Sequence, residues 1–129
     1  MRVRPEGSHA YNRLMSRIGT SVFDTVRGAP ADRVPVKLEK RSGADEWEFR
    51  TRALTDGDGH IENLLPEGLE LSAGVYRLTF DTGSYFEHHH QRGFYPEVSV
   101  VFDVQHPGAE VHIPLRLSPD GYSTKREDR

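Results

Sequence analysis

A histidine and an arginine share one face of the stretch VHIPLRLS, residues 111–118. Strict alternation along an extended chain puts His112 and Arg116 on the polar face. A neutral imidazole can take up a proton near pH 7, and a guanidinium can hold an anion. We therefore expect the two side chains to lie close enough to act on one ligand, the alternative being two exposed polar residues on a sandwich. The apolar face of the same stretch carries Val111, Ile113, Leu115 and Leu117.

Two further polar groups are candidates for binding or chemistry, and a third is not. His60 follows the turn TDGDG at 55–59, which lacks the glutamate of a calcium loop and so predicts a turn. The tail carries Ser123, Lys125 and Glu127 on one face of an expected last strand. Three histidines at 88–90 point about 100° apart on a helix, so they indicate a solvated helix end and no metal site.

Short β-rich runs between frequent turns must position these residues. Apolar side chains alternate in the stretches 34–38, 47–51, 76–80 and 98–104, which is typical of half-buried strands and of an all-β fold. In the second of these, Trp47, Phe49 and Thr51 are expected on one face. The exception is 84–92, where Ser84 as N-cap and Glu87 three residues later predict one short helix.

Composition limits the partners and the chemistry. The chain has 129 residues, 29% of them charged, and a net charge of -3, so no basic face for nucleic acid is expected. It has no cysteine, which excludes thiolate ligands and cysteine nucleophiles. The start has no apolar run that could span a membrane, so the cytoplasm is the expected compartment. We expect residues 1–15 to be a disordered extension and 16–129 to form a single domain.

Several stretches together resemble a known family. They are SVFDTVRGAPADRVPVKLEK, TDGDGHI, GVYRLTFDTGSYF, FYPEVSVVF and HIPLRLSPDGYST, at 21–40, 55–61, 74–86, 94–102 and 112–124. The combination is similar to the transthyretin-like proteins, and to their 5-hydroxyisourate hydrolase branch more than to the hormone carriers. The resemblance implies a sandwich of two four-stranded sheets with one short helix, assembled as a homotetramer around a channel.

The same resemblance implies a place for the active site and shows where this chain departs from it. The family's first catalytic histidine falls on Ser21, and its arginine falls on His60. The histidine that opens the family's His-Val-Pro-Leu strand matches His112. The closing Tyr-Arg-Gly-Ser falls on 125–128, where only Arg126 is retained. In the family reaction, water opens a ring by adding to its carbonyl, without metal or cofactor.

We therefore expect a cofactor-independent hydrolase acting on hydroxyisourate or a related small cyclic amide. The expected catalytic residues are His112, His60 and Arg116, with His112 as the base or water-orienting group. The expected substrate-binding residues are Ser21, Ser123, Lys125 and Arg126. The alternative is a non-catalytic protein that binds a small anionic ligand.

Charge in the tail also bears on assembly. A tetramer would bury Arg116 and Lys125, and an unpaired buried charge opposes association. Pairing with Glu127 or Asp128 would remove that cost, and without it we expect a homodimer.

Overall fold

The computed structural model describes residues 16–66, 68–69 and 71–127. The segment 1–15, predicted to be disordered, and Asp128 lie outside the described residues. The elements are β1 (Arg17–Asp24), β2 (Ala29–Pro30), β3 (Pro35–Arg41), β4 (Trp47–Leu54), β5 (His60–Ile61), β6 (Gly74–Phe80), α2 (Thr82–His88), β7 (Val98–Val104), β8 (Glu110–Ser118) and β9 (Gly121–Thr124).

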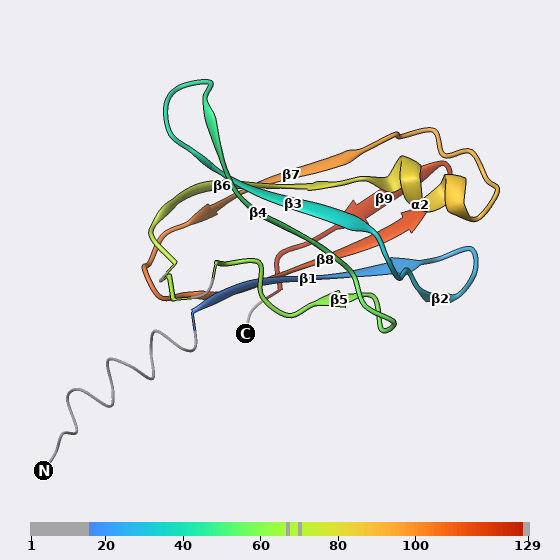
Figure 1. The fold of residues 1–129 in the computed structure, drawn as a ribbon, viewed down its shortest axis with the longest axis horizontal. Coiled ribbons are helices and arrows are strands. Elements are labelled where there is room, and N and C mark those ends of the chain that lie inside the picture. Colours follow the sequence, from blue (N-terminus) through green and yellow to red (C-terminus); the bar gives the residue numbers. More distant parts are fainter. Residues whose placement is uncertain (1–15, 67, 70, 128–129) are drawn as a thin grey trace, which may run out of the picture.

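The strands form two sheets that face each other across the core (Figure 1). One sheet has the order β4-β3-β6-β7, and its neighbours are all antiparallel. The other has the order β2-β1-β8-β9 and gains a fifth strand, because the short β5 also pairs with β1. Within the described residues, two layers of strands with one short helix confirm the predicted all-β sandwich, and β5 is the addition to the expected two sheets of four.

The core lies between the sheets and is built from alternate residues of each strand. Burial of an aliphatic or aromatic side chain of this kind contributes about 1.5–3 kcal/mol. The apolar faces predicted for 34–38, 76–80, 98–104 and 111–117 all point inward. Their fully or nearly fully buried members are Val34, Val36, Leu38, Tyr76, Leu78, Phe80, Val98, Val104, Ile113, Leu115 and Leu117.

Strand β4 departs from the predicted alternation. Thr51 lies opposite the buried Leu38, but the register shifts at the next position and Phe49 lies opposite Glu39. A bulge of this kind sends the following side chains to the other face of the sheet. Phe49 is consequently 57% exposed, so the prediction that it shares a face with Thr51 is wrong.

Helix α2 begins earlier than predicted. Its N-cap is Asp81, whose carboxylate accepts hydrogen bonds from the N–H and the hydroxyl of Ser84, so Ser84 lies within the helix and is not the cap. The hydroxyl of the buried Tyr85 donates to Asp24 at 2.7 Å, which ties the helix to the end of β1. Burial, and then this carboxylate, raise the pKa of Tyr85.

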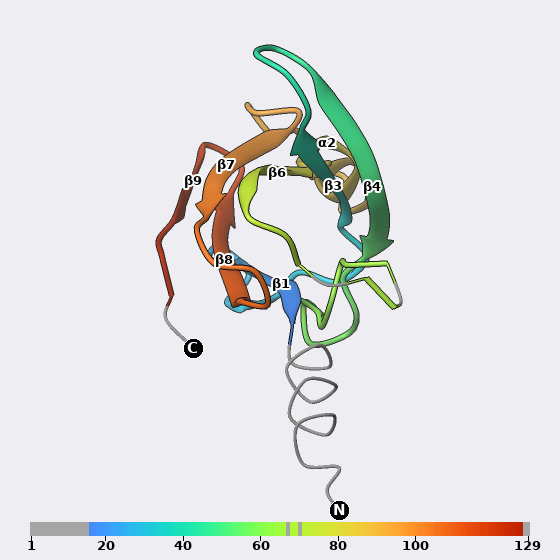
Figure 2. The same ribbon diagram turned by 90° about the vertical axis from the view of Figure 1, so that its left-hand side faces the viewer.

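The end-on view in Figure 2 shows the two layers and the chain continuing beyond β9 along β8. Among the residues that the structure describes, no helix covers the outer face of the sheet that contains β1 and β8. Because Ile18, Val22, Ile113 and Leu115 point into the core, the residues that alternate with them along each strand, such as Ser21 and His112, point outward. This outer face carries most of the residues singled out by sequence.

Candidate active site

His112 and Ser21 meet on the outer face of β1 and β8. The two strands run parallel, with Gly19 opposite His112 and Ser21 opposite Pro114. The hydroxyl oxygen of Ser21 lies 3.1 Å from Nε2 of His112, although the two residues are 91 positions apart in sequence. Their predicted proximity therefore depends on the first long strand pairing directly with the next-to-last strand.

His60 reaches the same place from the turn before β5. In that turn the carboxylate of Asp56 accepts hydrogen bonds from the N–H groups of Asp58 and His60. The bond from His60 is the main reason why the pKa of Asp56 is lowered. Gly59 has φ +76°, and a Cβ there would lie 2.5 Å from the carbonyl oxygen of Val22. The predicted turn thus sets β5 tightly against β1 and presents His60.

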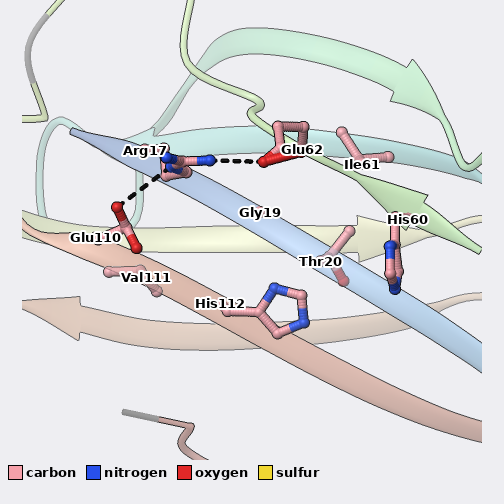
Figure 3. A pocket seen from close by; sticks show the side chains of 9 residues that line it. All are labelled: Arg17, Gly19, Thr20, His60, Ile61, Glu62, Glu110, Val111 and His112. Carbon is pink, nitrogen blue, oxygen red and sulfur yellow. Dashed lines mark hydrogen bonds and ion pairs between the residues drawn. The ribbon is translucent and has the colours of Figure 1, made fainter. Parts of the chain in front are cut away.

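The imidazole rings of His60 and His112 face each other across a small cavity. Their centroids are 6.4 Å apart and their planes are perpendicular. Figure 3 shows them on either side of β1, near Thr20. The cavity has a volume of about 90 Å³. It is lined by Arg17, Gly19, Thr20, His60, Ile61, Glu62, Glu110, Val111 and His112.

Arg17 forms the charged end of this cavity, and sequence reasoning missed it. Its Nη1 lies 2.6 Å from Glu62, and its Nε lies 3.4 Å from Glu110 (Figure 3). The alternation of RIGTSVFD, residues 17–24, places Arg17 on the same face as Ser21. That alternation was the available signal, because the resemblance to the family pointed only to Ser21 in this strand.

A wider hollow lies on the other side of His112. It has a volume of about 820 Å³ and runs between β7, β8 and the tail. Three tail residues, Lys125, Arg126 and Glu127, line it together with His112. His112 therefore stands between two hollows, with its side chain 15% exposed.

The structure separates Arg116 from His112. The two residues are four positions apart in β8, which corresponds to about 13 Å along a strand. The guanidinium of Arg116 lies over the ring of Phe23, 5.3 Å from its centroid, and Arg116 lines neither hollow. Ser123 lies directly opposite Arg116 on β9, and it does not line either hollow. Within one chain, Arg116 and His112 are therefore too far apart to contact the same small ligand, and a catalytic role for Arg116 stays a prediction.

Glu127 contacts His112, which was not predicted from the sequence. Its Oε1 lies 3.5 Å from Nε2 of His112, and the pairing with Arg116 or Lys125 expected across a subunit interface stays a prediction. A carboxylate thus stands beside the proposed base. The histidines at the helix end form no comparable site: the ring of His89 packs 4.6 Å from that of Tyr85 and 5.6 Å from that of His88.

The part of the chain that the structure describes has neither a metal site nor a membrane-spanning helix. Within it, no group of three or more His, Cys, Asp or Glu side chains is placed to hold a metal ion. Nor does any helix there have the length and apolar character needed to cross a membrane.

Comparison with known proteins places the chain in a family. The model of the HIUase/transthyretin family matches residues 18–127. The chain belongs to this family. The 5-hydroxyisourate hydrolase of Mus musculus is 37% identical over 113 residues, which are 86% of this chain and 94% of that protein. The enzyme of the same name from Salmonella dublin is 38% identical over 109 residues, 84% of this chain and 79% of that protein.

Solved structures of both branches of the family are similar to this chain. Sea bream transthyretin in complex with thyroxine has a TM-score of 0.80 and 31% identity, covering 88% of this chain and 96% of the other. Klebsiella pneumoniae 5-hydroxyisourate hydrolase has a TM-score of 0.75 and 27% identity, covering 88% of this chain and all of the other. The comparisons confirm the predicted family and its resemblance to the hydrolase branch.

Proposed function

We propose that this protein is a hydrolase that opens a small cyclic amide by adding water to a ring carbonyl. Its substrate is 5-hydroxyisourate or a related ring compound. One observation carries the proposal: His112 contacts the hydroxyl of Ser21 and faces His60 across a cavity, in a family whose mouse and Salmonella members are named 5-hydroxyisourate hydrolases.

The proposed chemistry uses His112 as the base or the group that orients water. As the water oxygen bonds to the carbonyl carbon, its proton passes to the imidazole and negative charge develops on the carbonyl oxygen. His60 and the hydroxyl of Ser21 are the nearby donors that can stabilise that charge. Collapse of the adduct then breaks the ring C–N bond, and the proton held by His112 is transferred to the leaving nitrogen. No cofactor takes part in these steps.

Lys125 and Arg126 are the proposed anchors for the anionic edge of the substrate. Both line the wide hollow beside His112. Ser21 takes no part in proton uptake near pH 7, because a serine hydroxyl does not titrate there. Its proposed role is to donate a hydrogen bond to water or to the substrate.

The second candidate function is ligand binding without turnover. The observations that favour it are the similarity to a transthyretin solved with thyroxine and the presence of Ser21 where the hydrolases are expected to have a histidine. Both functions use the same face of the molecule, so a measurement of substrate turnover is needed to distinguish hydrolysis from binding.

The test is to follow the absorbance of freshly generated 5-hydroxyisourate in buffer and after addition of purified protein. The wild-type protein is expected to accelerate the decay, and His112→Ala to lower kcat/KM by about a hundredfold or more. His88→Ala, at the exposed end of α2, is the matched control and should leave the rate unchanged. A wild-type rate equal to that of buffer contradicts hydrolysis of this substrate. Calorimetry with uric acid would then test the binding function.

We also propose that the protein assembles as a homotetramer, with a homodimer as the alternative. In support, β7 and β9 are edge strands within the described residues, and Val101 and Tyr122 on them are exposed. Light scattering decides the number of subunits. The cytoplasmic location stays a prediction.

A further inference from the structure

The register of the last hairpin brings Glu127 to His112. Strands β8 and β9 are antiparallel, with Leu115 opposite Thr124. The same register continues past the end of β9 to a bridge in which His112 lies opposite Glu127. Directly opposite residues in an antiparallel pair carry their side chains on the same face, about 5 Å apart at Cβ. The backbone therefore holds this carboxylate beside the imidazole.

The contact between the two side chains is at ion-pair distance and partly shielded from water. Oε1 of Glu127 lies 3.5 Å from Nε2 of His112, with the two side chains 39% and 15% exposed. The same Nε2 lies 3.1 Å from the hydroxyl oxygen of Ser21. A carboxylate can only accept a hydrogen bond, and a hydroxyl can accept one as well. A proton on Nε2 suits both neighbours at once, and in the neutral ring it leaves Nδ1 as the basic nitrogen.

Other charged and titratable groups face His112 from the neighbouring elements. His60 on β5 lies across the small cavity, and Arg17 on β1 lies at the end of that cavity, paired with Glu110. Lys125 and Arg126 line the wide hollow and act against protonation of the ring. We expect the net effect of these charges to favour protonation of His112. The carboxylate of Glu127 is within ion-pair distance of the ring, and Coulomb energy falls with distance.

We propose that Glu127 is a positioning residue for His112. Its carboxylate holds the ring with Nε2 protonated, directs the basic nitrogen Nδ1 to the reaction, and favours the imidazolium form. With Nε2–H donating to Ser21, the serine hydrogen is released for a water molecule or a substrate oxygen. The catalytic consequence rests on the proposed function, whereas the pairing itself does not.

The pairing is tested by nuclear magnetic resonance without substrate. Long-range proton–nitrogen spectra of ¹⁵N-labelled protein report the tautomer and the titration of each imidazole, and His112→Ala identifies the signals of His112. In Glu127→Gln we expect the titration midpoint of His112 to move to lower pH by several tenths of a unit, and the Nε2–H tautomer to lose its preference. Glu127→Asp should retain part of both effects.

The charge-matched control is Glu62→Gln. Glu62 lines the small cavity but pairs with Arg17, 2.6 Å away, and its side chain is 82% exposed. Its removal should move the His112 midpoint much less than removal of Glu127 does. An unchanged midpoint and tautomer in Glu127→Gln would overturn the pairing, as would equal shifts in both variants.

The role in catalysis is tested by the pH profile of kcat/KM. Activity requires the neutral ring, so the acid limb reports the His112 titration. In Glu127→Gln this limb should move to lower pH in step with the midpoint seen by resonance. A limb that stays in place while the midpoint moves overturns the positioning role. If no variant or wild-type protein turns over 5-hydroxyisourate, hydrolysis of this substrate is excluded, and the resonance comparison still supports or overturns the pairing.

Discussion

The outer faces of the two sheets both carry charged and aromatic side chains, but they use them differently. On the sheet formed by β4, β3, β6 and β7, Trp47 lies between Arg41 and Arg77, whose guanidinium carbons are 5.0 and 4.3 Å from its ring centroid. Arg77 also forms two contacts of 2.7 and 2.8 Å with Glu39. Cation–π contacts and a two-pronged ion pair thus engage these charges within the face itself.

The face formed by β1, β5 and β8 has imidazoles and a hydroxyl beside hollows in addition to the ion pairs of Arg17. His60 and His112 line a cavity, and Ser21 contacts one of the two rings. Neither hollow includes Trp47 or Arg77. The density of charge on a strand face therefore does not mark a site, whereas a group able to exchange protons beside a hollow does.

The largest effect on activity is expected from introducing a histidine on the face that carries the candidate site, compared with a histidine on the other face. Ser21→His restores an imidazole opposite His60, where a proton can be taken up near pH 7, so we expect kcat/KM to rise by about tenfold or more. Ser99→His is the matched control on the other sheet, where Ser99 contacts Thr79. Steady-state kinetics that respond equally to both substitutions would remove the distinction between the two faces.

A smaller effect, on stability, is expected when the outer face of the sheet β4-β3-β6-β7 loses Arg77. Arg77→Leu leaves Glu39, whose side chain is only 11% exposed, without its closest cation. We expect the free energy of unfolding to fall by about 1–2 kcal/mol, with kcat/KM unchanged. Urea denaturation measures the loss. No loss of stability, or a loss of activity, would mean that this face is not a structural one.

Arg116→Leu is expected to do less than Arg77→Leu, although each arginine lies over an aromatic ring. Arg116 is exposed, contacts Phe23, and lies about 13 Å along β8 from His112. We expect kcat/KM to stay within about threefold of wild type and stability to change by about 0.5 kcal/mol or less. A much larger fall in kcat/KM would return Arg116 to the catalytic group predicted from sequence.

The smallest effect concerns the turn that presents His60. The N–H of His60 holds the pKa of Asp56 below its unfolded value. The stabilisation by this carboxylate is therefore present above about pH 4 and is lost as pH falls through the folded-state pKa. Melting temperatures of wild type and Asp56→Asn should differ slightly at pH 7 and converge near pH 2. A difference that grows on acidification has the wrong sign for this mechanism.

Much of the fold could be predicted because alternation survives wherever strands run straight. The inward face of β8 and the outward position of His112 follow from the two-residue period alone. The same rule failed at Phe49, since a bulge is a property of the strand pair and leaves no mark in one strand. The start of α2 was missed because Ser84 and Asp81 both suit a cap, and the tertiary structure selects Asp81.

The site was predicted in part. Ser21, His60 and His112 are brought together, and the resemblance to the family had selected these three positions. Arg116 shares the face of His112 but lies about 13 Å from it along β8, because residues on one strand face can be far apart. The contact of Glu127 with His112 was not predicted, although it could have been counted from the Ser118–Gly121 turn, since a hairpin turn fixes which residues lie opposite each other.

The parallel pairing of β1 with β8 has a consequence for how the protein is made. Ser21 and His112 are 91 residues apart, so the chain between them must be synthesised before they can meet. Loops of this length slow the search for native pairings, and sheets that depend on them fold late. A nascent chain can order the hairpin of β3 and β4 early, but Ser21 and His112 cannot meet until residue 112 has left the ribosome. The contact between these two side chains therefore reports that β1 and β8 have paired.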